Sequence, residues 1–451
     1  MWTAKTWLIC IAVGLTASAT VYGAQRRYDN YQVVHVVPND EKALDMLQMF
    51  AELNRHLDFW KEPSKVGVGA DVMVTKGQLE NMKAELDGYD FSIKKLANVQ
   101  DLLDNEKIQM MATDAQNALE SKNQEFNLPL DQYHQYPEIV SWLRYLAATY
   151  PSIVNVSSIG KSFQGQDMIQ IKIGKPQPGA TKRGFWIDAG IHAREWVAPA
   201  TSLYIINELV TKYASNSHYK QLVDNIDFYI LPSANPDGYA YTWSHDRLWR
   251  KTRSGPRCHK TWFGTKKCCY GVDPNRNWDF HWGEAGVSHN PCDITYCGPS
   301  AASEIEIQNM ANWMMAHKNS LQAYMTLHSY SDMWFWPYAY KKHTYPSDVN
   351  KLRAISQTAY NDMKSVDGTS YTRGSPPDIL YAASGSSFDW TRNPNGPAID
   401  LSFGMELRPG TGDKENDYVY GFQLPPRLIL LAAREAWAGI IDIANYMLTH
   451  H

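Results

Sequence analysis

Short apolar runs alternate with amphipathic stretches along most of the chain, from about residue 123 to residue 451. The runs "GFWIDAG", "IDFYILPSA", "LQAYMTLHSY" and "AIDLSFGMEL" have the length and apolar content of buried strands. Between them lie stretches with helical spacing of apolar residues, such as "APATSLYIINELVTKYA" and "SEIEIQNMANWMMAHK". This alternation predicts an α/β domain with a mixed, largely parallel central sheet flanked by helices, in which ligands bind beyond the carboxyl ends of the strands.

Residues 1–23 have the pattern of a secretory signal peptide. Lys5 precedes the apolar run "WLICIAVGL", and the small-residue segment "VYG" follows it. The apolar run is well short of the ~20 residues that a membrane span needs. The other apolar stretch, "LILLAAREAWAGIIDIANYML", contains Arg434 and Glu435 and is predicted to be a core helix. We therefore expect a secreted, extracellular protein with no membrane partner.

Residues 24–122 form a separate unit in this interpretation. The stretches "YQVVHVVP" and "DVMVTK" resemble strands, whereas "DEKALDMLQMFAEL" and "TKGQLENMKAEL" have helical spacing. Their order and size predict a small α/β open sandwich. A charged, amide-rich connecting helix with a linker is expected from about Asp104 to Lys122. The predicted units are thus 1–23, 24–122 and 123–451.

Five cysteines remain once the signal is removed, and all lie between residues 258 and 297. Secretion permits disulfides. Because five is an odd number, at most two bridges form and one thiol is left over. A four-cysteine zinc site is the alternative, but Cys268 and Cys269 are adjacent, which is not the usual ligand spacing. The cysteines are therefore expected to staple one loop region.

Composition and motif exclude three classes of function: nucleic-acid binding, serine hydrolysis and dinucleotide binding. The chain has 43 basic and 47 acidic residues and a formal net charge of −4, so no basic surplus indicates a nucleic-acid partner. Neither a G-x-S-x-G nucleophile elbow nor a G-x-G-x-x-G dinucleotide loop occurs in the sequence.

Polar residues follow two of the predicted strands at the point where each strand ends. His192 and Glu195 come directly after "GFWIDAG", and His328 follows "AYMTL". Two imidazoles and one carboxylate are a usual ligand set for catalytic zinc. Spacing alone is weak, because a second H-x-x-E pair, His281 and Glu284, occurs in the cysteine-bounded loop. A surface ion pair and a core histidine are the alternatives.

Six blocks in order make the metal hypothesis specific: "HAREW", "LWRKTRS", "GVDPNRNWD", "LHSYS", "LYAASGSSFDW" and "MELRPG". Together they resemble the zinc metallocarboxypeptidases of the digestive A/B type over essentially all of 123–451. The segment 24–122 resembles the activation pro-domain of the same family. The resemblance implies a peptide hydrolase that is made as a zymogen, binds one Zn²⁺ in its catalytic domain and acts on peptides or proteins with a free C-terminus.

The resemblance also assigns roles to individual residues. His192, Glu195 and His328 match the zinc ligands. Glu406 matches the general base that activates water, and Arg253 matches the arginine that stabilises the developing oxyanion.

The remaining matches concern substrate binding. Asn275 and Arg276 match the clamp for the terminal carboxylate, Tyr381 matches the mobile tyrosine that covers it, and Arg194 matches an arginine along the substrate path. Phe388 stands where B-type enzymes have an aspartate at the floor of the specificity pocket. This implies the A-type, apolar preference, because a buried Lys or Arg would lack a counter-charge.

Some features depart from the family or stay open. Phe388 is bulkier than the aliphatic residue usual in A-type enzymes, so aromatic and aliphatic preferences are not distinguished. Pro376 and Pro377 are unusual on one pocket wall, and "GTGDKENDY" is longer than the typical loop.

The resemblance implies a Cys269–Cys292 disulfide and a pro-domain that covers the cleft until a trypsin-like protease cuts the linker, for which Lys122 is the preferred position. A catalytically inactive peptide-binding relative and a carboxypeptidase of other specificity are the alternatives.

Overall fold

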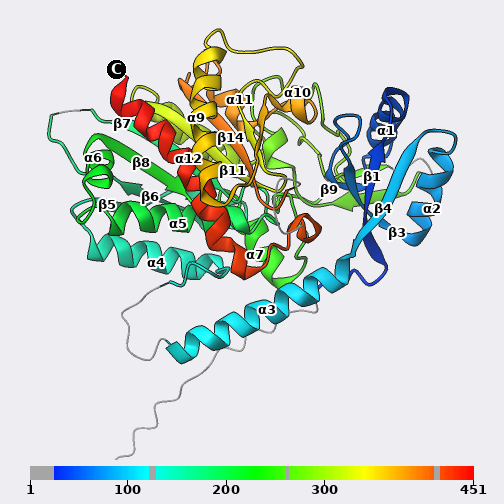
Figure 1. Ribbon diagram of the computed structural model, residues 1–451, viewed down its shortest axis with the longest axis horizontal. Helices are drawn as coiled ribbons and strands as arrows, with labels where there is room; N and C mark the ends of the chain where they lie inside the picture. Colours follow the sequence, from blue (N-terminus) through cyan, green and yellow to red (C-terminus); the bar gives the residue numbers. More distant parts are fainter. Residues whose placement is uncertain (1–24, 121–127, 180, 261–263, 411–416, 451) are drawn as a thin grey trace, which may run out of the picture.

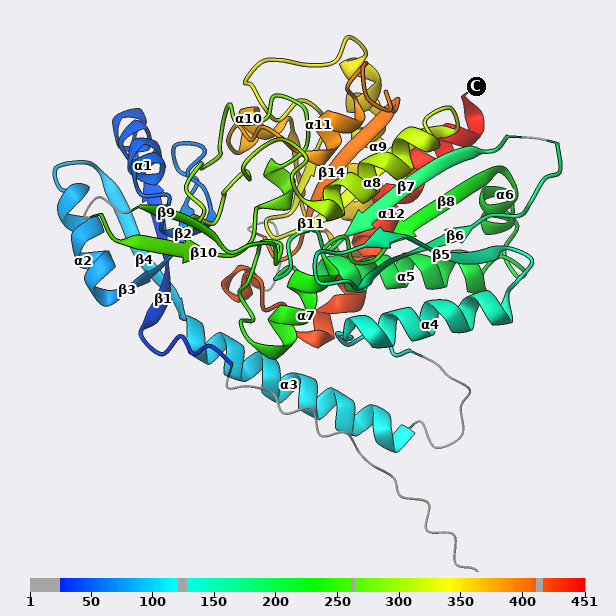
Figure 2. The same cartoon turned by 180° about the vertical axis from the view of Figure 1, so that it is seen from behind.

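The computed structural model describes residues 25–120, 128–179, 181–260, 264–410 and 417–450. The predicted signal peptide, Lys122 and most of the long loop after Glu406 lie outside the described residues. Within the described part of the chain, no helix is both long and apolar enough to cross a bilayer. Two units are present, a small N-terminal domain and a large α/β domain, with a long helix running from the first beneath the second (Figures 1 and 2).

The small domain is a four-stranded antiparallel sheet in the order β2-β3-β1-β4, with two helices packed on it. Asp40 caps the first helix through its side chain, and a Thr75–Gln78 capping box begins the second. The open-sandwich prediction is confirmed, but the connecting helix α3 begins five residues earlier than expected. The elements are β1 (Tyr31–Pro38), α1 (Glu41–Leu53), β2 (Asp58–Lys61), β3 (Ala70–Thr75), α2 (Lys76–Glu85), β4 (Phe91–Asn98) and α3 (Val99–Glu120).

The large domain is built on an eight-stranded mixed sheet in the order β13-β12-β14-β11-β7-β8-β6-β5. The four strands β14, β11, β7 and β8 are parallel to their neighbours within that group, whereas β6 and β5 are antiparallel additions at one edge. The predicted mixed, largely parallel sheet is therefore confirmed. Its strands are β5 (Val154–Lys161), β6 (Asp167–Ile173), β7 (Arg183–Ala189), β8 (Ile226–Leu231), β11 (Leu321–Ser329), β12 (Met333–Phe335), β13 (Thr372–Gly374) and β14 (Leu401–Leu407).

Side-chain alternation divides the strands between two cores. Along β14, Phe403 and Met405 belong to the core that is covered by α5, α9 and α12. Gly404 and Glu406 alternate with them and therefore face the opposite side, where α8 and α11 pack. The helices are α4 (Tyr136–Thr149), α5 (Val197–Thr211), α6 (Ser217–Asn225), α7 (Pro236–Ser244), α8 (Ile305–Ala316), α9 (Val349–Asp367), α10 (Pro376–Ile379), α11 (Ser387–Thr391) and α12 (Ile429–Thr449), with short 3₁₀ helices η1 (Pro274–Arg276), η2 (Asp417–Tyr420) and η3 (Pro426–Leu428).

The last helix, α12, contains the apolar stretch with Arg434 and Glu435, and Glu435 is fully buried. It packs against α9 and α5, which confirms that this stretch is a core helix.

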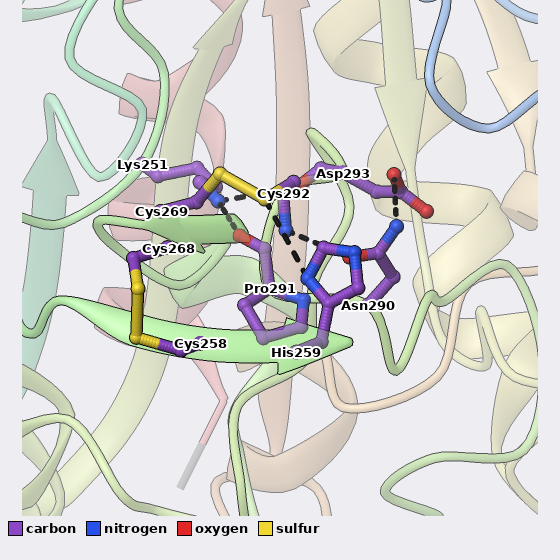
Figure 3. The surroundings of a disulfide bond; sticks show 9 residues. All are labelled: Lys251, Cys258, His259, Cys268, Cys269, Asn290, Pro291, Cys292 and Asp293. Atoms are coloured by element: carbon purple, nitrogen blue, oxygen red, sulfur yellow. Dashed lines mark hydrogen bonds between the residues drawn. A yellow bond between two sulfur atoms is a disulfide. The ribbon is translucent and has the colours of Figure 1, made fainter. Parts of the chain in front are cut away.

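Two disulfides cross-link the loop region between α7 and α8. Cys258–Cys268 links the two strands of a hairpin, β9 (Arg257–Lys260) and β10 (Lys266–Cys269), and Cys269–Cys292 ties that hairpin to the next loop (Figure 3). Cys297 is a free, buried thiol. The expectation of two bridges with one cysteine left over is confirmed, as is the pairing of Cys269 with Cys292.

Candidate active site

The three predicted metal ligands meet at the carboxyl ends of two neighbouring strands. β7 ends at Ala189, and Gly190 turns the chain at a φ of +65°, where a side chain would approach Pro199 at 3.1 Å. His192 and Glu195 follow in that turn, and His328 lies near the end of β11, which is paired with β7. Parallel pairing thus brings residues 133 and more positions apart to one edge of the sheet.

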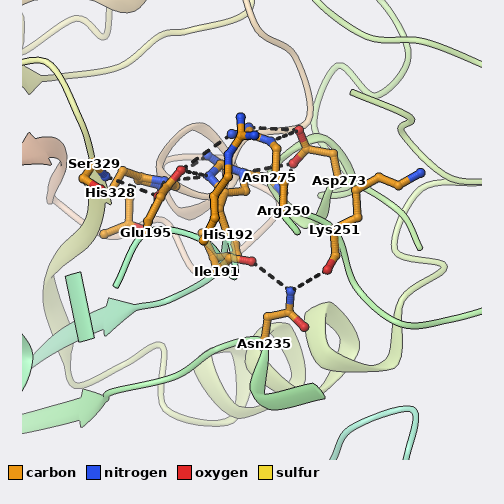
Figure 4. A network of polar contacts seen from close by, with 12 residues as sticks. Ile191, His192, Glu195, Asn235, Arg250, Lys251, Asp273, Asn275, His328 and Ser329 are labelled. Carbon is orange, nitrogen blue, oxygen red and sulfur yellow. Dashed lines mark hydrogen bonds and ion pairs between the residues drawn. The ribbon is translucent and has the colours of Figure 1, made fainter. Parts of the chain in front are cut away.

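The donor atoms of these three buried side chains converge. His192 Nδ1 lies 2.8 Å from Glu195 Oε1 and 3.1 Å from His328 Nδ1, and His328 Nδ1 lies 3.2 Å from Glu195 Oε2. All three ligand atoms lie within 4.8 Å of one another, as a shared cation requires. Figure 4 shows the cluster and the polar residues around it.

Second partners hold each imidazole in one orientation. The other ring nitrogen of His192, Nε2, contacts Asp273 Oδ1 at 3.0 Å. His328 Nε2 contacts the hydroxyl of Thr326 at 3.2 Å, and that hydroxyl donates to Asp188 at 2.8 Å. With the proton on Nε2, each ring has an oxygen acceptor for it, in Asp273 or Thr326, and presents the Nδ1 lone pair to a metal.

The electrostatics of the cluster suit a cation. Burial lowers the pKa of His192, with Arg250 adding to the effect, which favours the neutral imidazole that binds metal. Burial alone would raise the pKa of Glu195, but His192 and His328 lower it below its usual range. The carboxylate therefore stays ionised.

Glu406 lies on β14 directly opposite His328 in the parallel β11–β14 pair, and its side chain lines the same cleft. Its Oε2 is buried and has no hydrogen-bond partner. In the protein alone, burial and the neighbouring Glu195 raise the pKa of Glu406 well above its ordinary value.

The structure places Arg250, and not Arg253, at this site. Arg250 lines the cleft, with its guanidinium 3.0 Å from Asp273 and 3.6 Å from Glu195. Arg253 stacks 3.6 Å over the ring of Tyr241, away from the cleft. The expectation for Arg253 is corrected: both arginines lie within "LWRKTRS", but a backbone bond from Ala193 N–H to the Arg250 carbonyl fixes residue 250 beside the metal ligands.

Asn275 and Arg276 form the short helix η1 and line the cleft together with Tyr381. Arg276 Nη2 donates to the Tyr381 hydroxyl at 3.1 Å, and its Nε donates to the Gly286 carbonyl at 2.9 Å. The Asn275 side-chain oxygen accepts from the Ser387 N–H at 2.9 Å, which ties the clamp to α11.

An apolar recess extends from this cleft. It includes Phe335, Ala339, Pro376, Leu380, Ala383 and Phe388. Asp389, next to Phe388, does not face it, because its carboxylate accepts the backbone N–H groups of Ala339 and Tyr340 at 2.8 and 3.1 Å. Pro377 is buried but does not line the cleft.

Sequence comparisons agree with this geometry. A family profile described as "Zinc carboxypeptidase" matches residues 139–439. The chain belongs to the zinc carboxypeptidase family. A second profile, "Carboxypeptidase activation peptide", matches residues 34–106 of this carboxypeptidase. The donor set of two imidazoles and one carboxylate fits catalytic zinc, which identifies Zn²⁺ as the cofactor.

Its relatives include both specificity types. Carboxypeptidase A2 of Mus musculus is 37% identical over 429 residues, covering 94% of this chain and 96% of the relative. Carboxypeptidase B of Astacus astacus is 40% identical over 315 residues, covering 70% of this chain and 97% of the relative.

Solved structures show the same fold over nearly the whole chain. Thrombin activatable fibrinolysis inhibitor matches with a TM-score of 0.78 and 30% identity, covering 94% of this chain and all of that one. Carboxypeptidase A from Helicoverpa armigera matches with a TM-score of 0.81 and 28% identity, covering 94% of this chain and 98% of that one.

The small domain of this carboxypeptidase reaches into the cleft through β2. Asp58 forms a two-pronged ion pair with Arg194, at 2.6 and 3.0 Å, and Arg194 is 1% exposed. Phe59, Trp60, Lys61 and Glu62 line the cleft alongside the metal ligands. Arg194, which was predicted to lie along the substrate path, is thus ion-paired with the small domain.

Sequence reasoning missed the residues that support the site from a distance. Asp273 contacts both His192 and Arg250. It was not singled out from the sequence, although it lies inside the motif "GVDPNRNWD". Asn235 donates to the carbonyls of Ile191 and Lys251, and so fastens the His192 turn to the Arg250 segment (Figure 4). Asp273 could have been found as the acid within its motif, whereas nothing around Asn235 signals its role.

The second H-x-x-E pair makes an ordinary surface contact. His281 Nδ1 lies 2.8 Å from Glu284, with side chains 33% and 56% exposed. No third ligand joins them among the described residues.

Proposed function

We propose that this carboxypeptidase is a secreted zymogen whose large domain, once the small domain has been cut away, hydrolyses apolar C-terminal residues from peptides. One observation carries the proposal: the metal ligands, Glu406, three arginines and an apolar recess all open into a single cleft. A metal, a base, an anion-binding group and a side-chain pocket are the parts that exopeptidase chemistry needs.

Recognition of the free C-terminus falls to Asn275 and Arg276. The guanidinium of Arg276 is planar and its forked N–H groups suit a terminal carboxylate. Tyr381, whose hydroxyl accepts a hydrogen bond from Arg276 at 3.1 Å, covers the bound carboxylate and excludes water from it. The last side chain of the substrate then enters the apolar recess.

Proton transfer is assigned to Glu406. Its partnerless Oε2 takes a proton from the attacking water and returns it to the departing amine. Arg250 stabilises the negative charge that develops on the scissile carbonyl oxygen, and Asp273 keeps this guanidinium in place. His192, Glu195 and His328 would hold the Zn²⁺, which would supply Lewis-acid polarisation and lower the pKa of water.

The A-type preference is supported by the charges around the recess. Among the described residues, the carboxylates that line the cleft are Glu62, Glu195 and Glu406. The first leaves with the small domain, the second is a metal ligand and the third is the base. A substrate Lys or Arg would find no free counter-charge in the recess, and its desolvation would be uncompensated.

Latency follows from the position of β2 in the cleft. The small domain would be released by a trypsin-like protease that cuts the linker, with Lys122 as the proposed position. Substrates are peptides or proteins with a free C-terminus.

The test is C-terminal release from peptides ending in Phe, Leu, Lys and Glu by the trypsin-activated protein, with and without a zinc chelator. We expect release of the apolar residues, its loss on chelation and its recovery when Zn²⁺ is added back. Preferential release of Lys would refute the A-type assignment. Release that survives removal of the metal would refute the mechanism.

A further inference from the structure

We propose that Phe388 and Gly404 together shorten the specificity pocket, so that this enzyme selects short aliphatic C-terminal residues and discriminates against aromatic ones. The inference rests on the proposed carboxypeptidase activity and goes beyond its A-type assignment. It follows from how Phe388 packs against Gly404 and Phe335, and it assigns to Gly404 a role in specificity.

Gly404 is a glycine in the middle of a central strand, where glycine weakens the sheet. Its φ is not in the left-handed region, so the backbone conformation does not require it. Space is tight on this side of the strand, so an added side chain would make the neighbouring ring give by a few tenths of an ångström. A Cβ at this position would lie 3.3 Å from Cδ1 and 3.5 Å from Cε1 of Phe388, and 3.5 Å from the Thr326 methyl carbon.

The ring of Phe388 is therefore seated against the backbone of β14. Phe388 lies in the first turn of α11, is 5% exposed and lines the recess. Phe335 is directly opposite Gly404 in the β12–β14 pair and lines the same recess. The two phenyl rings lie nearly parallel, at 10° and 6.4 Å between centroids.

The depth of the pocket is set by the position of this floor relative to the base. Gly404 and Glu406 face the same side of β14 and are two residues apart, which is about 6.6 Å along a strand. His328 and Thr326 mark the same two levels on β11. A substrate side chain that enters at the level of Glu406 therefore meets the Phe388 ring about one residue pair further in.

Such a pocket separates side chains by length. A valine- or leucine-sized group buries its methyl groups against the two rings. A phenylalanine or tryptophan side chain must displace the Phe388 ring, which is backed by Gly404 and stacked on Phe335. Differences of this size in an apolar pocket change kcat/KM by about 10- to 200-fold.

The first experiment uses the activated wild-type enzyme. Blocked peptides that differ only in the last residue, Ala, Val, Leu, Phe or Trp, are compared by kcat/KM. We expect Leu or Val to exceed Phe by about 10-fold or more, with Trp lower still. Phe cleaved as well as Leu, or better, would overturn the inference while leaving the proposed function intact. No release from any peptide would overturn both.

The second experiment is a double-substitution cycle. Phe388→Ile should raise the Phe/Leu ratio of kcat/KM by about 10-fold, because it removes the floor. Gly404→Ala should push the ring inward and reduce cleavage after Leu more than after Ala. In the Phe388→Ile background, the same Gly404→Ala change should no longer alter cleavage after Leu relative to cleavage after Ala.

Zinc content and the thermal transition are measured alongside, since a merely structural defect lowers every substrate together. An identical effect of Gly404→Ala with and without the ring would show that Gly404 does not act through Phe388. If a variant does not fold, the wild-type series alone decides.

Discussion

Asp58→Asn should raise the activity of the uncleaved zymogen. Asp58 is the small domain's partner for Arg194 in the cleft, with bonds of 2.6 and 3.0 Å. The guanidinium of Arg194 is 1% exposed and the Asp58 side chain 15% exposed, so water screens this pair poorly. The substitution keeps the shape of the side chain but removes its charge, and Arg194 is then left buried without a counter-ion.

The magnitude follows from that geometry. Truncating one partner of a buried, hydrogen-bonded ion pair costs about 2–5 kcal/mol. Asparagine retains one acceptor oxygen and Asp58 is partly exposed, so we take the lower end, about 2–3 kcal/mol. At about 1.4 kcal/mol per factor of ten, the equilibrium between docked and undocked small domain shifts by about 30- to 150-fold.

The assay is the initial rate of peptide hydrolysis before any protease is added, expressed as a fraction of the rate after complete activation. Asp29→Asn is the matched control, because Asp29 pairs with Arg27 on the surface of the same domain, with side chains 53% and 62% exposed. Activated enzyme should behave identically in all three proteins. A latent rate for Asp58→Asn equal to that of Asp29→Asn would refute the reasoning.

Three further outcomes are expected. Arg250→Ala should lower kcat by about 10²–10³-fold, whereas Arg253→Ala should leave steady-state kinetics nearly unchanged; the reverse order would reinstate Arg253. Asp273→Asn should weaken zinc binding by about 10- to 100-fold in chelator competition, because it removes the acceptor for His192 Nε2. Burial, with Glu304 and Asp237 adding, raises the pKa of Glu306 to about 7. Its folded-state pKa lies above its unfolded value, so stability falls as pH rises through about 4.5 to 7, by up to about 3 kcal/mol. The Tm of Glu306→Gln minus the Tm of wild type should therefore increase from pH 5 to pH 8, and a constant difference would contradict this.

The sequence predicts what local pattern controls. Apolar periodicity places the strand that precedes His192 and the strand that contains His328, because burial on both faces demands apolar residues there. Parallel pairing of those strands then brings their ends together without further information. The two disulfides follow from the clustering of five cysteines in one loop region, although which cysteines pair depends on the hairpin register that sets Cys258 opposite Cys268.

Contacts between distant segments could not be predicted in this way. Asp58 and Arg194 are 136 positions apart, and the charge of either is equally compatible with a solvated surface. Arg250 and Arg253 belong to one short motif, and tertiary contacts decide which guanidinium reaches the cleft: Ala193 N–H donates to the Arg250 carbonyl, and Asp273 pairs with the Arg250 guanidinium. The glycine at position 404 carries no apolar signal, since its effect lies in the side chain that it lacks.

One physical reason underlies both the proposed latency and the proposed selectivity of this molecule. A buried charge must keep its partner, and a packed ring must keep its space. In the cleft, Arg194 has its partner only while the small domain is docked, whereas Arg250 has a permanent one in Asp273. On the proposed function, release of the small domain would free Arg194 to engage substrate and would leave Arg250 paired with Asp273. If Arg250 also depended on the small domain for its partner, cleavage would open the cleft to substrate but would disorder Arg250. The activated enzyme would then bind substrate and turn it over slowly.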